Sequence, residues 1–238
     1  MTAPASLARV VKRLLFALAA ILSAAAGATE IRTVDWAPTA VGAEPAADAR
    51  WLRFDLPHRW TAAEGSPLQG VALRMRFALA AAPAEPWAVL LTTLADGGRV
   101  SVNGRFIGAI PMADADTHVR WRRPHLLAID PALLAPGDNT LLVQTAYRGG
   151  PHALAGVEVG SLMELSPRHE LQFFLSYTLT WIGATVAAVI GLVFGVLWLR
   201  RREPMLGLLT LAAVFWVARS AYFLVEAMPV ELWLWLRL

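Results

Sequence analysis

The chain has 238 residues, of which 57% are hydrophobic and 16% charged, and its formal net charge is +3. Soluble domains are about 45–50% apolar by residue, so the excess predicts contact with a membrane. No cysteine is present, which excludes disulfides and cysteine-ligated zinc. The basic residues are scattered or flank apolar runs, a pattern that favours membrane orientation over nucleic-acid binding.

The first 28 residues have the pattern of a secretory signal peptide. Basic residues up to Arg13 precede an apolar run over 14–26, and small residues around Ala28 match a cleavage site. The run is short for a membrane span, although an uncleaved anchor helix remains the alternative. Both interpretations place the following segment outside the cytoplasm.

Residues 29–167 change to a hydrophobic period of two. Apolar and polar residues alternate over 52–56 and 71–79, which predicts half-buried antiparallel strands. Asn103-Gly104 predicts a type I′ hairpin turn, and Asp130-Pro131 predicts a capped helical turn. Further strands are expected over 87–94, 125–129, 140–147 and 156–165. We therefore predict an all-β sandwich or jelly roll as the extracytoplasmic domain.

Part of this region resembles the galactose-binding-like jelly roll. The resemblance rests on VSVNGRFIGAIP, on WRRPHLLAIDPALLAPGDNTLLVQTAY and on GVEVG. That family has an Asn-Gly hairpin followed by a strand, an Asp-Pro step and a Pro-Gly-x-Asn turn before the next strand. Each piece also has a mechanical role as turn, cap or strand, so the motif indicates a fold more than a ligand.

Two α-helical transmembrane segments are expected after the β domain. Residues 171–199 carry no charge and exceed the roughly 20 residues that cross a bilayer, so the first span is placed at 170–200. Arg200, Arg201 and Arg202 follow, and the positive-inside rule makes this triplet cytoplasmic. The small-xxx-small pair Gly191 and Gly195 suggests a helix-packing face and is weak evidence for a homodimer.

The second span is expected over 204–228, starting at Pro204. Residues 230–238 open another apolar run that is too short to cross alone, so we interpret it as the start of a truncated third transmembrane helix. The chain would then be a fragment or the product of a truncated reading frame. Arg219 and Glu226 are seven residues apart and would share one helix face as intramembrane polar residues. Alternatively, both reach the lipid headgroups.

An exported jelly roll followed by several spans resembles the N-terminal sensor region of bacterial seven-transmembrane receptors of the histidine kinase or diguanylate cyclase type. The resemblance implies a signal-transduction protein of the inner membrane, with its β domain in the periplasm. The sequence has no kinase, cyclase or hydrolase motif, so no enzyme activity and no cofactor are expected of this chain. The alternative is a membrane-anchored carbohydrate-binding or assembly subunit without signalling output, and an anchored hydrolase is a third hypothesis.

Candidate ligand-binding residues are tryptophans beside arginines, because such pairs can stack on a sugar ring and bind its hydroxyls. They are Trp121 with Arg120 and Arg122, and Trp60. The alternative is that these indole rings cover the edge of the core. A small molecule, a carbohydrate or a periplasmic protein would be the partner.

The loop with Asp114, Asp116 and His118 offers alternate carboxylates, which calcium prefers as ligands. Full coordination needs six or more oxygens, so a polar loop is the favoured interpretation. No histidine pair has zinc spacing, and we expect no metal.

Overall fold

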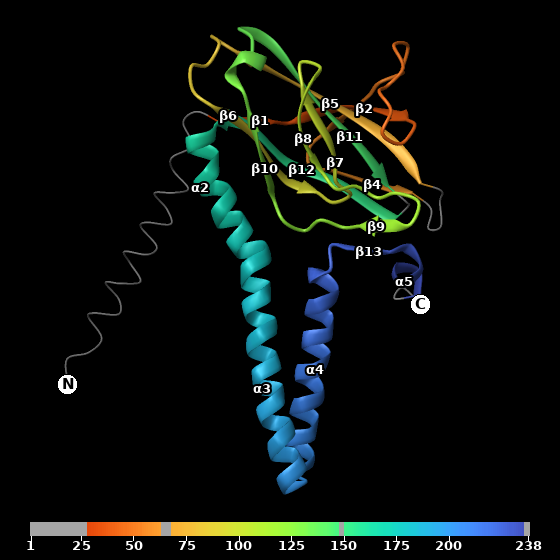
Figure 1. The fold of residues 1–238 in the computed structure, drawn as a ribbon, viewed down its shortest axis with the longest axis vertical. Coiled ribbons are helices and arrows are strands. Elements are labelled where there is room, and N and C mark those ends of the chain that lie inside the picture. Colours follow the sequence, from red (N-terminus) through yellow and green to blue (C-terminus); the bar gives the residue numbers. More distant parts are fainter. Residues whose placement is uncertain (1–27, 63–67, 148–149, 236–238) are drawn as a thin grey trace, which may run out of the picture.

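The computed structural model describes residues 28–62, 68–147 and 150–235 (Figure 1). Apart from Ala28, the expected signal peptide lies outside the described residues. Apart from the short strand Thr117–Val119, the strands between Thr29 and Ser161 form two facing antiparallel sheets, and long helices lead away from them. The chain is thus mostly β-sandwich, as the sequence predicts, with helices added.

The two sheets divide the strands as follows. The first has the order β1-β12-β6-β10, with β4 also paired to β12, and the second has the order β3-β2-β5-β11-β7-β8. The strands of the first sheet are β1 (Thr29–Ile31), β4 (His58–Ala62), β6 (Trp87–Leu94), β10 (His125–Ile129) and β12 (Gly150–Ser161). Those of the second are β2 (Thr33–Thr39), β3 (Leu52–Asp55), β5 (Gln69–Leu79), β7 (Gly98–Val102), β8 (Arg105–Ile110) and β11 (Gly137–Tyr147).

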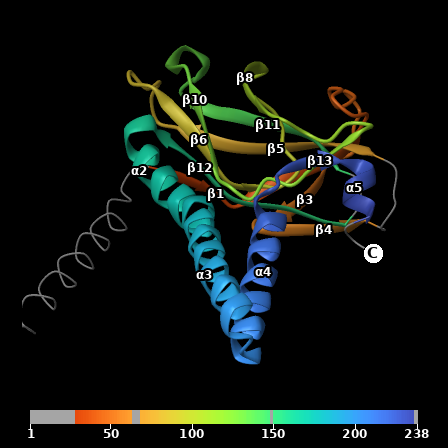
Figure 2. The same ribbon diagram turned by 60° about the horizontal axis from the view of Figure 1, so that its bottom comes forward.

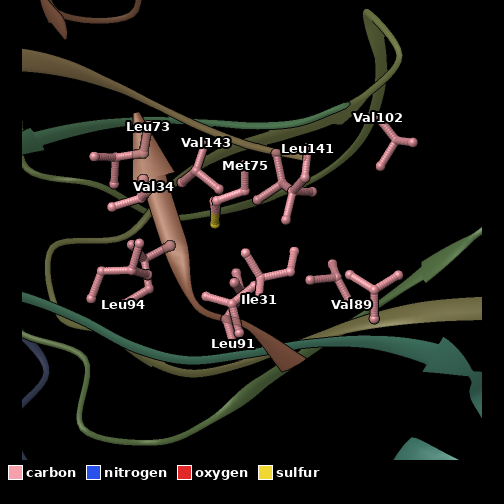
Figure 3. Close-up of a cluster of buried hydrophobic side chains, with 14 of the residues drawn as sticks. Ile31, Val34, Leu73, Met75, Val89, Leu91, Leu94, Val102, Leu141 and Val143 are labelled. Carbon is pink, nitrogen blue, oxygen red and sulfur yellow. The ribbon is translucent and has the colours of Figure 1, made fainter. Parts of the chain in front are cut away.

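The core lies between the two sheets (Figure 3). Along β5, Leu73 and Met75 are fully buried, whereas Arg74 and Arg76 point to the opposite face of the sheet. The predicted alternation of this strand is confirmed. Leu91 closes the core from the facing sheet, so each sheet supplies one apolar face to a common interior.

The residues that carry the galactose-binding-like resemblance stabilise turns and cap a helical turn. Asn103 and Gly104 have φ values of 49° and 77°, which confirms the type I′ turn between β7 and β8. Asn103 Nδ2 donates to Asn139 Oδ1 at 2.7 Å, and Asn139 is only 1% exposed. Asp130 caps the 3₁₀ turn Pro131–Leu133 (η1) by accepting a backbone N–H bond at 2.9 Å. These side chains hold turns together.

The first long helix begins inside the segment where a strand was expected. The prediction of a strand over 156–165 is wrong at its end, because α2 (Leu162–Phe173) starts directly after β12. Ser161 caps this helix by accepting the N–H of Glu164 at 3.3 Å, a Ser-x-x-Glu signal present in the sequence. Leu165 is fully buried against the first sheet, so α2 is fixed to the sandwich.

Helix α2 continues without a break through the π-helical turn Phe174–Thr178 (η2) into α3 (Leu179–Arg201). Arg202, with φ at 56°, reverses the chain, and α4 (Pro204–Leu224) returns beside α3. Both views show this helix pair directed away from the sandwich (Figures 1 and 2). By length and composition, Leu162–Arg201 and Pro204–Ala221 could each cross a membrane.

Gly191 and Gly195 serve the packing of α3 against α4 within the chain. A Cβ at Gly191 would lie 2.8 Å from the Cβ of Ala213, and one at Gly195 would lie 3.5 Å from Thr210 Cγ2. The small-xxx-small face is therefore occupied by α4, which removes its support for a homodimer.

The end of α4 departs from the prediction. The helix stops at Leu224 instead of residue 228, because the chain turns extended and β13 (Ala227–Pro229) pairs with β9 (Thr117–Val119) of the β domain. The short helix α5 (Val230–Trp235) follows and contacts β9 and β13. Figure 2 shows α5 beside β13. Within the described part of the chain, the segment expected to begin a third span thus lies against the sandwich.

Candidate ligand site at the domain–helix junction

The loop between β9 and β10 places Trp121 at the edge of the core. Its side chain is 9% exposed, and its indole Nε1 donates to the carbonyl of Pro111 at 2.6 Å. The ring is therefore not free on the surface for sugar stacking, and the structure matches the core-edge interpretation. Arg120 and Arg122 are exposed on the same loop.

A cavity of about 280 Å³ lies where this loop and β10 meet α2. Its volume is near the lower end of the size range of small-molecule sites. Phe173 and His169 reach it from α2, while Trp121, Arg123 and His125 reach it from the β domain. The sequence analysis found Trp121 and missed the two histidines, because only the fold brings α2 beside β10.

We call this the junction cavity, and one of its polar side chains, His125, is uncharged and has a nitrogen without a hydrogen-bond partner. Burial, with smaller contributions from Arg123 and His169, lowers the pKa of His125 to about 4, so this imidazole is neutral at neutral pH. Its Nε2 atom is buried and makes no hydrogen bond. Buried polar groups normally have partners, so this atom is a candidate contact for a ligand hydroxyl.

Arg123 connects the cavity with the end of α4. Its Nε lies 3.4 Å from Glu226 Oε2, and its guanidinium carbon lies 5.1 Å from the Trp121 ring centre and 5.6 Å from that of Tyr177. Tyr177 lines a second cavity of about 330 Å³ together with Arg122 and Leu224. The junction thus holds two cavities. Arg123 lines the first and lies over Tyr177 in the wall of the second.

Glu226 is positioned by backbone pairing and not by a helix face. Its carbonyl accepts the N–H of Arg120 at 2.7 Å, and its side chain is 10% exposed. Burial raises the pKa of its carboxyl, while Arg123 and the backbone N–H of Arg122 act in the opposite direction. The expectation that Glu226 and Arg219 share one helix face is wrong, because α4 ends at Leu224, before Glu226.

The remaining predicted residues lie elsewhere. Trp60 is in β4 opposite His152, and its side chain is outside the described residues. Asp114 Oδ1 accepts the backbone N–H groups of Asp116 and Thr117 at 2.9 and 2.7 Å, so it shapes the loop. No group of three His, Cys, Asp or Glu side chains in the described ranges could hold a metal ion.

A basic cluster on the second sheet was not predicted. Asp35, on β2, lies 2.9 Å from Arg53 Nε, 3.4 Å from Arg74 Nη2 and 3.6 Å from Arg76 Nη2. The hydrogen bond from Arg53 is the main cause that lowers the pKa of Asp35. The four residues come from three adjacent strands, so the cluster ties β3, β2 and β5 together on the face opposite the core.

No protein-family model and no curated protein matches this sequence. Among solved structures, it is similar to a GH2 β-galacturonidase from Eisenbergiella tayi, at 13% identity and a TM-score of 0.40, over 57% of this chain and 24% of that one. A β-glucuronidase from Ruminococcus gnavus has 13% identity and a TM-score of 0.39, over 57% of this chain and 29% of that one. A family 35 carbohydrate-binding module from Clostridium thermocellum has 12% identity and a TM-score of 0.31, over 57% of this chain and 99% of that one.

The chain spans only about a quarter of the length of these glycosidases. At such identities and scores the likeness concerns the type of β-sandwich alone. The receptor resemblance of the sequence finds no counterpart among these three structures.

Proposed function

We propose that this chain is a membrane-anchored binding protein whose β-sandwich takes a small ligand of the carbohydrate class in the junction cavity. The observation that carries the proposal is the lining of that cavity. Phe173 and the largely buried Trp121 form apolar parts of its wall, and Arg123, His125 and His169 offer polar groups. Polar groups that converge beside apolar side chains are a feature of small-molecule sites.

The anchoring part of the proposal rests on the exposed surface of the helix pair. Only 11% of the most apolar stretch of Leu162–Arg201, and 6% of that of Pro204–Ala221, is buried inside the protein. Side chains such as Leu192, Leu208 and Phe215 would otherwise face water. With a rise of about 1.5 Å per residue, α3 is long enough for a hydrocarbon layer of about 30 Å.

The arginine triplet lies at the end of the helix pair farthest from the sandwich (Figure 1). This arrangement agrees with a cytoplasmic Arg200–Arg202 turn and an extracytoplasmic β domain in the bacterial inner membrane. Reporter fusions test it: a reporter joined after Arg202 is expected to be active only inside the cell. Activity of that fusion outside the cell would contradict the proposed orientation.

Calorimetric titration of the full chain in lipid nanodiscs tests the binding part. We expect saturable binding of at least one member of a panel of neutral, amino and acidic monosaccharides. His125→Phe removes the buried polar nitrogen and should abolish that binding, whereas His58→Phe, on the distant strand β4, should retain it. Absence of binding across the panel would contradict the proposal.

A sensory role is the second candidate, and one observation favours it. The cavity is built jointly by the β domain and by α2, and Arg123 also holds the segment that leaves α4. A ligand in this position contacts elements on both sides of the junction, so its affinity can differ between two arrangements of the helices.

A further inference from the structure

We infer that the junction cavity selects ligands that carry a carboxylate, and that this carboxylate competes with Glu226 for Arg123. The inference rests on the proposed function and names the ligand class and the regulation of the same site. Its starting point is that one guanidinium group belongs to both the cavity wall and the ion pair with Glu226.

The preference for an anion follows from the charges of the lining. Among the described residues that line the cavity, Arg123 is the one with a fixed charge, and none carries a carboxylate. His125 and His169 add N–H and nitrogen groups suited to hydroxyls. Guanidinium groups bind carboxylates through paired hydrogen bonds, so a sugar acid or hydroxy acid matches this set better than a neutral sugar.

The ion pair with Glu226 is incomplete as it stands. Arg123 Nε lies 3.4 Å from Glu226 Oε2 and makes no hydrogen bond, and the other carboxylate oxygen, Oε1, is buried without a hydrogen-bond partner. A buried carboxylate that loses its counter-charge is strongly destabilised. A ligand that takes Arg123 therefore makes the buried position of the Glu226 side chain unfavourable.

The backbone geometry allows this side chain to leave. The Glu226 carbonyl is held independently by Arg120, and Val230 N–H donates to the Asp116 carbonyl at 2.9 Å. Ligand binding is thus expected to release the Glu226 side chain first and, as a consequence, to weaken the pairing of the segment between α4 and α5 with β9. Conversely, Glu226 lowers the affinity for acidic ligands, because coupling between two binding events is reciprocal.

The test compares D-glucuronate with D-glucose, which differ at the carboxylate, by calorimetry on the full chain in nanodiscs. The wild-type protein should bind glucuronate more tightly. Glu226→Gln should raise the glucuronate affinity by on the order of tenfold and leave glucose unchanged. Arg123→Gln should remove the preference. Glu231→Gln, an exposed carboxylate on α5, is the matched control and should behave as wild type.

A second measurement uses the unmodified protein and so does not depend on how the variants fold. Amide hydrogen exchange of residues 225–230 should accelerate with saturating glucuronate and not with glucose. Unchanged exchange, or a Glu226→Gln variant that binds glucuronate no more tightly than wild type, overturns the inference. Binding of glucose without glucuronate overturns the inference and leaves the proposed function intact, whereas absence of binding across the full sugar panel overturns both.

Discussion

His125 shows at the scale of one residue how the junction sets a charge. Desolvation is the main cause of its lowered pKa, and the positive groups that add to it are Arg123 and His169. With a pKa of about 4, this imidazole takes up a proton in the folded chain only at acidic pH, whereas exposure to water would return its pKa toward 6.5. Its titration therefore reports on the integrity of the junction.

The stability of the chain should depend on pH through His125. The unfolded imidazole titrates near 6.5 and the folded one near 4, so between these values the unfolded state binds more protons. Stability is then full above about pH 6.5 and falls as the pH drops toward 4. Thermal melting in nanodiscs from pH 4 to 7 checks this.

In His125→Gln the part of the pH dependence due to this residue disappears, so the melting temperature should fall less on acidification. Asp35 contributes a separate loss of stability below its unfolded pKa of about 3.8, because its folded pKa is lowered. Equal slopes for wild type and variant between pH 4 and 6.5 would contradict the assigned burial of His125.

At the scale of elements, the packing of α3 on α4 depends on Gly191. A side chain there would meet Ala213, whereas a side chain at Gly183 of the same helix meets nothing within 4 Å. Gly191→Val should destabilise the helix pair by about 1–3 kcal/mol, the usual cost of overpacking. Gly183→Val is the matched control and should melt close to wild type. Similar melting temperatures for both variants would show that the helices do not pack as described.

Local signals account for the elements that the sequence predicts correctly. The period of two places β5, Asn103-Gly104 specifies its hairpin, and Asp130 caps its turn, because each depends on neighbouring residues only. The start of α2 also has a local signal, the Ser161 cap with Glu164 three residues later, but the apolar residues around it led to the prediction of a strand.

The junction site could not be predicted in the same way. The ion pair between Arg123 and Glu226 joins residues far apart in the chain, and no spacing rule connects them. The helix-face argument for Glu226 assumed that α4 continues, whereas backbone pairing of β13 with β9 ends it earlier. Trp121 was found from composition, but its burial depends on the fold around it.

At the scale of the whole molecule, the sandwich and the helices form one connected structure. Arg168 of α2 forms ion pairs with Glu158 of β12 and, at 3.2 Å, with Glu164. The segment after α4 is joined to the β domain a second time, through the pairing of β13 with β9. The β domain is therefore attached to the helix pair at two places (Figure 1). The junction cavity is lined in part by α2, at one of these attachments.

The most direct test of a ligand site between sandwich and helix is to fill the cavity. Ala109 is exposed on β8 and lines the cavity, whereas Ala78 is exposed on β5 of the second sheet and does not line it. In calorimetric titrations of the full chain with glucuronate, Ala109→Trp should abolish the binding and Ala78→Trp should retain it. Binding of wild-type strength by a correctly folded Ala109→Trp variant would contradict the account.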